Sequence, residues 1–148
     1  MRKAFIGGNW KCNNTLAQTQ QMITNIVDPL EFDNSKVDVV VAPIYLHLVT
    51  VMFTKKQPNV QVAAQNCAVN SFGAFTGEIA AEQIKDINIS WVIVGHSERR
   101  THHGEDDKTV CKKVDNAMKT GLKVIYCFGE TLEQREAKET MDVIKRQL

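Results

Sequence analysis

The sequence lacks any long apolar run. No segment approaches the roughly 18–20 consecutive apolar residues that a membrane-spanning helix requires. The N-terminal segment carries positive charges at Arg2 and Lys3 but has no apolar core of the kind found in signal peptides. We therefore expect a cytoplasmic location and no membrane partner.

The sequence also lacks an excess of charge of either sign. Lys and Arg number 18 and Asp and Glu 17, which gives a net charge of +1. No basic cluster or Arg-rich helix offers the positive surface that binding to nucleic acid requires. We expect no nucleic-acid partner.

Closely paired cysteines are absent as well. The four cysteines are Cys12, Cys67, Cys111 and Cys127. They are widely spaced and form no C-x-x-C pair, which predicts free, mostly buried thiols in a reducing compartment. The adjacent His102 and His103 would point apart in most backbones, so we expect no metal site there.

A regular alternation of strand-like and helix-like segments fills the 148 residues. Five short apolar runs are continuous rather than alternating, which is typical of parallel strands covered on both faces. These runs are Ala4–Ile6, Val37–Ala42, Val60–Ala64, Trp91–Val94 and Leu122–Cys127. No linker or shift in composition divides the chain. We predict a single α/β domain over residues 1–148, built from five successive βα units.

Apolar spacing and capping signals predict the helices between and after these strands. Three apolar faces are expected: Leu16, Ile23, Ile26, Val27 and Leu30; Val110, Val114, Ala117 and Met118; and Ala137, Met141, Ile144 and Leu148. A capping-box pattern from Thr131 to Gln134 opens the last of these helices. Gly121 is suited to the end of the helix before it.

Two architectures fit five βα units. An open sheet of the flavodoxin type would be complete at this length, whereas a (β/α)₈ barrel has eight units in about 250 residues. Hydrophobic periodicity does not distinguish them. An open-sheet binding module would need an acidic pocket or a phosphate-binding glycine run, and neither follows the first predicted strand.

The segment Trp91–Arg100 changes abruptly from apolar to polar. Its apolar strand ends at Gly95, and His96 is followed by serine, glutamate and two arginines. Chemistry in α/β proteins is placed at the carboxyl ends of parallel strands. A histidine satisfied by local hydrogen bonds is the simpler interpretation of His96. A following helix start would instead favour a neutral imidazole, which can donate a hydrogen bond to a carbonyl.

The first predicted strand ends in a second polar group. Gly7 and Gly8 allow close packing or a turn, and Asn9 and Lys11 then emerge at the carboxyl edge. A lysine there can bind an anion or stabilise developing negative charge. Taken alone, a solvated lysine after a turn is the simpler interpretation.

The connection after the third strand is long and carries exposed-looking aromatic side chains. It runs from Gln65 to Glu78 and includes Phe72 and Phe75. Long loops with apolar tips in small domains usually bind something. A partner subunit is the simplest candidate, and a lid over a ligand is the alternative.

Five motifs taken together resemble the triosephosphate isomerase family. They are Gly7–Lys11, Gln65–Asn66, Gly73–Glu78, Gly95–Arg100 and Cys127–Thr131, each at the family's spacing. The resemblance covers the whole chain and implies a parallel (β/α)₈ barrel, of which this chain supplies about five units. It implies interconversion of dihydroxyacetone phosphate and D-glyceraldehyde 3-phosphate through an enediolate, in glycolysis and gluconeogenesis, without cofactor or metal.

The resemblance also implies roles for individual residues. Lys11 matches the lysine whose charge stabilises the enediolate and the substrate phosphate, with Asn9 beside it. His96 matches the neutral histidine that polarises the substrate carbonyl, a case already known for this family. Glu98 matches a carboxylate next to that lysine, and Cys127 matches a buried supporting residue.

A homodimer is implied as well, formed through the loop from Asn66 to Glu78. Thr76 matches the tip of this loop, which enters a pocket of the partner subunit. The interface residues implied in this way are Cys12, Gln65, Asn66, Thr76 and Glu78.

Some features depart from the family pattern. Ile44, His103 and Phe128 differ locally from the residues usual at their positions, which affects packing only. The family's catalytic glutamate, its lid and its phosphate-binding loops follow later strands than these five. We therefore expect a portion of a longer enzyme that is inactive as an isolated chain. The alternative is a non-catalytic truncated barrel that acts through self-association.

Overall fold

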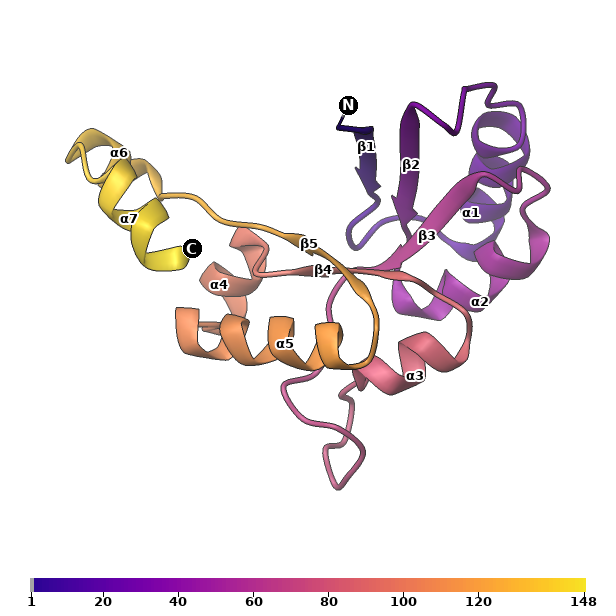
Figure 1. The fold of residues 1–148 in the computed structure, drawn as a ribbon. Coiled ribbons are helices and arrows are strands. Elements are labelled where there is room, and N and C mark those ends of the chain that lie inside the picture. The colour runs from indigo at the N-terminus through magenta and orange to yellow at the C-terminus, as the bar shows by residue number, and fades with distance from the viewer. Residues whose placement is uncertain (1) are drawn as a thin grey trace.

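The computed structural model describes residues 2–148 as a curled parallel sheet with most of its helices along the outer side (Figure 1). The strands are β1 (Ala4–Asn9), β2 (Val37–Ala42), β3 (Val60–Ala64), β4 (Trp91–Val94) and β5 (Lys123–Tyr126). They lie in the order β1-β2-β3-β4-β5, and each neighbouring pair is parallel. A doubly wound open sheet reverses its strand order at a switch point. The sequential order therefore excludes the flavodoxin alternative and confirms part of a (β/α)₈ barrel.

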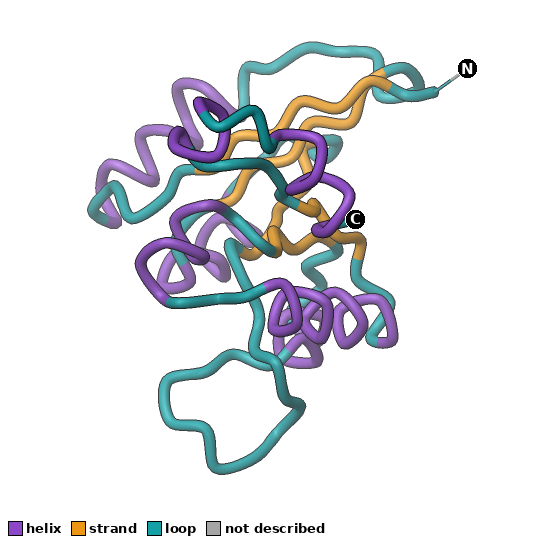
Figure 2. The backbone as a smooth tube through the Cα atoms, turned by 90° about the vertical axis from the view of Figure 1, so that its left-hand side faces the viewer, coloured by secondary structure: helices purple, strands orange, loops and turns teal. Residues whose placement is uncertain are grey.

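Helices follow each strand in turn (Figure 2). They are α1 (Leu16–Met22), the π-helix η1 (Ile23–Val27), α2 (Tyr45–Thr54), α3 (Ala81–Asp86), α4 (Ser97–His103), α5 (Asp107–Lys119), α6 (Leu132–Glu136) and α7 (Thr140–Gln147). Two helix ends carry the caps that the sequence indicates. Thr131 and Gln134 form a capping box at α6, and Gly121 has a φ of +80° just after α5.

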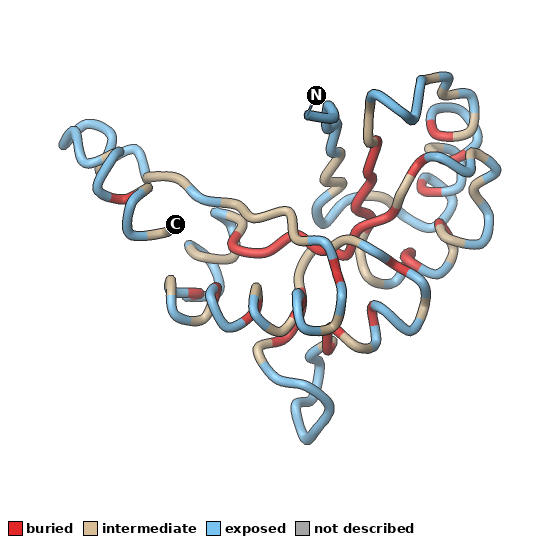
Figure 3. The backbone as a smooth tube through the Cα atoms, in the orientation of Figure 1, coloured by how far each residue is buried: buried red, intermediate tan, exposed pale blue. Residues whose placement is uncertain are grey.

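The main hydrophobic core lies between the sheet and the helices. Val41 and Val92 from the strands pack there with Val51, Ile84 and Val110 from the helices. A second, smaller cluster lies on the inner face of the curl, where Val40, Ala42, Ala63 and Ile93 are buried. Burial is thus greatest in the three central strands (Figure 3).

The prediction that every strand is covered on both faces is wrong for β1. Phe5 is 44% exposed and Ile6 59% exposed. β1 lies at one edge of the five-stranded order, with β2 as its neighbour. The side chains of an edge strand have fewer neighbours than those of a central strand, although the residue types are the same.

The amino ends of the strands carry a polar chain across the inner face. Asp38 accepts hydrogen bonds from Lys3 Nζ at 2.7 Å and Gln61 Nε2 at 3.1 Å. Gln61 Oε1 in turn accepts from the indole N–H of Trp91 at 2.7 Å. The hydrogen bond from Lys3 holds the pKa of Asp38 below its usual value. This chain links β2, β3 and β4 at the end opposite to the predicted site.

The helix predictions need several corrections. Leu16, Met141 and Leu148 are 47%, 61% and 74% exposed instead of facing the core. The last helix is not continuous, because Lys138 takes a φ of +62° and separates α6 from α7. Met118 is 64% exposed instead of facing the core. Ile26 is 53% exposed, since it lies in η1, where a wider turn changes the face expected for an α-helix.

The cysteines are free, as predicted, but they are not mostly buried. Cys67 is buried and Cys127 is partly buried, whereas Cys12 and Cys111 are exposed. Cys111 lies on the solvent-facing side of α5, and Cys12 lies in the turn after β1.

Candidate active site

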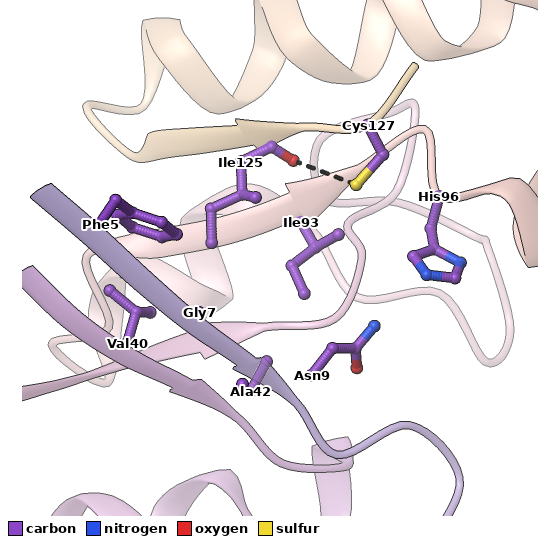
Figure 4. Close-up of a pocket in the computed structure, with 10 residues that line it drawn as sticks. Phe5, Gly7, Asn9, Val40, Ala42, Ile93, His96, Ile125 and Cys127 are labelled. Carbon is purple, nitrogen blue, oxygen red and sulfur yellow. Dashed lines mark hydrogen bonds between the residues drawn. The ribbon is translucent and has the colours of Figure 1, made fainter. Parts of the chain in front are cut away.

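The carboxyl ends of β1 and β4 bring the predicted polar residues to one place. A cavity of about 230 Å³ on the inner face is lined by Asn9, His96 and Cys127 together with apolar strand residues. Figure 4 shows the ring of His96 and the amide of Asn9 at the same end of this cavity. A second cavity, of about 320 Å³, adjoins it, since Asn9 and His96 line both. Lys11 and Glu98 line the second cavity.

Lys11 is held in an unusual backbone conformation. Its φ is +55°, a left-handed value that a residue with a side chain adopts at an energetic cost of about 1–2 kcal/mol. Its N–H donates to Asn9 Oδ1 at 3.0 Å, and its carbonyl accepts from Gln65 Nε2 at 2.9 Å. Gln65 also donates to the carbonyl of Ala42 at 2.8 Å, so the turn is tied to β2. These contacts direct the lysine toward the site.

The Lys11 side chain pairs with Glu98. Lys11 Nζ lies 2.6 Å from Glu98 Oε1, and both side chains are about half exposed. The hydrogen bond from Lys11 lowers the pKa of Glu98. Glu98 is therefore a carboxylate at neutral pH, and the pair places a fixed positive charge beside His96.

The histidine caps helix α4. His96 Nδ1 accepts a hydrogen bond from the backbone N–H of Glu98 at 3.2 Å. Glu98 Oε2 lies 3.5 Å from the same nitrogen, which would be an ion pair only with a protonated ring. The amide contact is the shorter and needs an unprotonated Nδ1, so the geometry favours a neutral ring with its proton on Nε2. Such a ring can donate a hydrogen bond from Nε2.

The turn before His96 depends on glycine. Gly95 has a φ of +79°, and a Cβ atom there would lie 2.8 Å from the carbonyl oxygen of Cys127 and 2.9 Å from Val110 Cγ1. The ends of β4 and β5 can therefore approach each other only without a side chain at this position.

Gly95→Ala is expected to lower the free energy of unfolding by about 2.5 kcal/mol, because it adds backbone strain and a steric overlap. Gly104→Ala is the matched control, since Gly104 also has a positive φ but an added Cβ would meet no atom within 4 Å. The control should lose only about 1 kcal/mol. Denaturant unfolding of both variants measures this, and equal losses would contradict a close approach at Gly95.

Cys127, for which the resemblance implies a buried supporting role, is less buried than expected. It is partly buried and lines the inner cavity, and its Sγ lies 3.9 Å from the carbonyl oxygen of Ile125 (Figure 4). Burial raises the pKa of its thiol. The group is therefore a neutral thiol packed behind the site.

The predicted interface residues fall into two places. Cys12, Gln65 and Asn66 line the second cavity. A loop between β3 and α3 protrudes from the rest of the fold (Figure 2). Thr76 and Glu78 belong to this loop, and residues 71–78 are all exposed. Phe72 is 68% and Phe75 44% exposed. Within one chain, the loop tip does not line either site cavity.

A buried ion cluster behind the site was not predicted from the sequence. Glu105 Oε1 accepts from Arg99 Nε at 2.7 Å and from Lys113 Nζ at 2.6 Å, and Lys113 Nζ also donates to Asn66 Oδ1 at 3.1 Å. The hydroxyl of Tyr45 donates to the carbonyl of Asn66. Burial opposes ionisation of Glu105, but the hydrogen bonds from Lys113 and Arg99 outweigh it and lower its pKa. The cluster joins α4, α5 and the base of the loop.

Residues 2–148 contain no group of three or more His, Cys, Asp and Glu side chains arranged to hold a metal ion. No helix in the same range is long and apolar enough to cross a membrane.

Comparison with known proteins gives consistent matches along the chain. The family model of triosephosphate isomerase matches residues 4–148. A cytosolic triosephosphate isomerase of Oryza sativa subsp. japonica is 49% identical over 99% of this chain and 57% of the relative. One from Stellaria longipes is 48% identical over 99% and 57%, and a triosephosphate isomerase of Magnetococcus marinus is 47% identical over 100% and 58%. The chain therefore spans less than three-fifths of the length of these relatives.

Proposed function

The chain belongs to the triosephosphate isomerase family, and we propose that it forms the electrophilic part of a site that interconverts dihydroxyacetone phosphate and D-glyceraldehyde 3-phosphate. One observation carries the proposal. The ammonium group of Lys11, fixed by Glu98 at 2.6 Å, and a neutral His96 ring line the same cavity. This arrangement suits a reaction in which negative charge develops on a carbonyl oxygen.

Each group then has a defined task. His96 donates from Nε2 to the substrate carbonyl and polarises it, as already known for the neutral histidine of this family. Lys11 stabilises the negative charge of the enediolate and attracts the substrate phosphate. Asn9 contributes its amide at the same end of the cavity, and Glu98 holds the lysine in place. Cys127 supports the turn from behind.

The reaction also requires a carboxylate base to move the proton between adjacent carbons. Glu98 is engaged by Lys11, and its Oε2 lies toward Nδ1 of the histidine. We therefore assign the base, the lid and the phosphate-binding backbone to sequence beyond residue 148. The 148-residue chain alone would then not turn over the substrate.

The proposal is tested on a completed barrel, in which residues 1–148 are followed by the part of the rice relative that the match leaves uncovered. We expect isomerisation of glyceraldehyde 3-phosphate by the completed barrel and none by the 148-residue chain. A correctly folded completed barrel without isomerase activity would contradict the assignment. Activity of the isolated chain would contradict the absence of the base.

The partner is proposed to be a second copy of the chain, through the loop from Asn66 to Glu78. The exposed Phe72 and Phe75 support this, because apolar side chains on a protruding loop favour burial against a partner. The second candidate function, self-association without catalysis, uses the same loop. The activity of the completed barrel distinguishes the two.

Thr76→Arg is expected to weaken self-association of the completed barrel at least about tenfold, because a long charged side chain at the loop tip would have to be desolvated at an interface. Thr24→Arg is the matched control, since Thr24 is also exposed but lies in η1. Sedimentation velocity over a concentration series measures both dissociation constants. Equal values for the two variants would show that the tip lies outside the interface.

A cytosolic location and a role in glycolysis and gluconeogenesis complete the proposal. Two of the relatives above carry the word cytosolic in their names, which supports the location.

A further inference from the structure

The backbone turn that carries His96 is tied from behind by a side chain. The carbonyl oxygen of Gly95, the residue before the histidine, accepts a hydrogen bond from Arg100 Nε at 2.9 Å. An added Cβ at Gly95 would lie 3.3 Å from Arg100 Nη2, so the guanidinium packs directly against the turn. The Arg100 side chain is only 16% exposed. The contact is therefore built into the interior between β4 and α5.

A second contact fixes the position of the guanidinium itself. Arg100 Nη1 pairs with Asp107 Oδ1 at the start of α5. The other carboxylate oxygen, Asp107 Oδ2, accepts from Arg146 Nε of α7 at 2.9 Å. Burial opposes ionisation of Asp107, but the hydrogen bonds from Arg146 and Arg100 outweigh it, so its pKa lies below the usual value. Arg100 is thus anchored to a carboxylate at one end and to the Gly95 carbonyl at the other.

The geometry points to Arg100 as a positioning residue for His96. The imidazole accepts the N–H of Glu98 only if the turn holds the ring above the first turn of α4. The carbonyl of His96 is engaged by that same helical turn, through the N–H groups of Arg99 at 2.8 Å and Arg100 at 3.1 Å. The position before the histidine is held instead by the side chain of Arg100. Without the hydrogen bond from Arg100, the backbone of Gly95 can rotate more freely. The imidazole of His96 can then lose the hydrogen bond from the Glu98 N–H, which keeps Nδ1 unprotonated.

Arg100 and Arg146 offer a matched pair for the test. Both pair with Asp107, but only Arg100 reaches the Gly95 carbonyl. Arg100→Lys keeps the positive charge, yet an ammonium group lacks the planar fork that reaches two acceptors in this way. Arg100→Met removes both contacts. Arg146→Met removes one contact of Asp107 and leaves the turn intact.

The experiment uses the 148-residue chain without substrate and has two readouts. The first is the ¹⁵N signal of His96 Nδ1 near neutral pH, which reports whether this nitrogen is an unprotonated acceptor. The second is hydrogen exchange of the Glu98 amide relative to the Val110 amide, which donates to the Asp106 carbonyl at the start of α5.

In Arg100→Lys and Arg100→Met, we expect the Nδ1 signal to move toward a mixture of tautomers. The exchange ratio should rise about tenfold in these variants and stay within twofold in Arg146→Met.

Three outcomes would overturn the inference. The first is a folded Arg100→Lys variant with unchanged Nδ1 signal and exchange ratio. The second is an equal change in Arg146→Met, which would make Asp107 the relevant residue. The third is unfolding of Arg100→Lys while Arg146→Met stays folded, because Arg100 would then support the whole domain and not the turn. The inference relies on the proposed function only for the importance of His96. A completed barrel without isomerase activity would not change these readouts.

Discussion

Lys11→Met in the completed barrel is expected to lower kcat/KM for glyceraldehyde 3-phosphate by about 10³-fold. Methionine keeps much of the length of the side chain and removes the charge that stabilises the enediolate and attracts the phosphate. Because one group serves both tasks, kcat should fall and KM should rise. Steady-state kinetics of the purified variant in the direction of dihydroxyacetone phosphate measures both parameters.

Lys3→Met is the matched control for this prediction. Lys3 precedes the same strand and also pairs with a carboxylate, Asp38, at 2.7 Å, but at the opposite end of the sheet. Its kcat/KM should remain within about twofold of the unmodified protein, since the pair lies at the end of the sheet opposite to the site. A Lys11→Met variant that folds normally and keeps more than a tenth of the activity would contradict the role assigned to Lys11.

Most of the fold could be predicted from the sequence because its signals are local. Continuous apolar runs predict all five strands, although β1 extends to Asn9 and β5 covers only Lys123–Tyr126. The order of the strands could not be predicted from periodicity, since open and closed sheets bury the same residue types. The break at Lys138 was also missed, because the apolar spacing continues across it. Exposure of Phe5 and Ile6 depends on neighbours and not on residue type.

The site could be predicted only in part. The carboxyl ends of two strands indicated Lys11, Asn9 and His96 in advance, and the structure brings them together around adjoining cavities. Their catalytic roles remain predictions. The supporting contacts were missed, because Gln65 and Arg100 act through backbone carbonyls, and no residue pattern encodes such contacts. The pairing of Glu105, in the connection between α4 and α5, with Lys113 of α5 is likewise hidden, since charged side chains usually face solvent.

The Glu105–Lys113 pair leads to the largest expected effect on stability. Lys113→Met should lower the free energy of unfolding of the chain by about 4 kcal/mol, because it leaves a buried carboxylate with one cationic partner fewer. Both side chains are at most 5% exposed, and Glu105 Oε2 has no hydrogen-bond partner among the described residues. Lys119→Met, on the same helix, removes an exposed pair with Asp115 and should change stability by less than about 0.5 kcal/mol. Urea unfolding at neutral pH measures both.

The pH dependence separates loss of the ion pair from loss of packing. In the unmodified chain the pKa of Glu105 lies below its unfolded value of 4.5. The ionised carboxylate therefore contributes to the free energy of unfolding above pH 4.5, and this contribution is lost as the pH falls through the lowered pKa. Without Lys113, burial should raise this pKa, so the carboxyl becomes neutral at a higher pH and its burial becomes less unfavourable. The difference in the free energy of unfolding between Lys113→Met and the unmodified chain should therefore narrow from pH 7 to pH 4.

A double variant gives a second test. Adding Glu105→Gln to Lys113→Met should recover part of the lost stability at pH 7, since it removes the buried charge. If the difference in the free energy of unfolding did not depend on pH and were not reduced in the double variant, the loss of stability would come from packing alone.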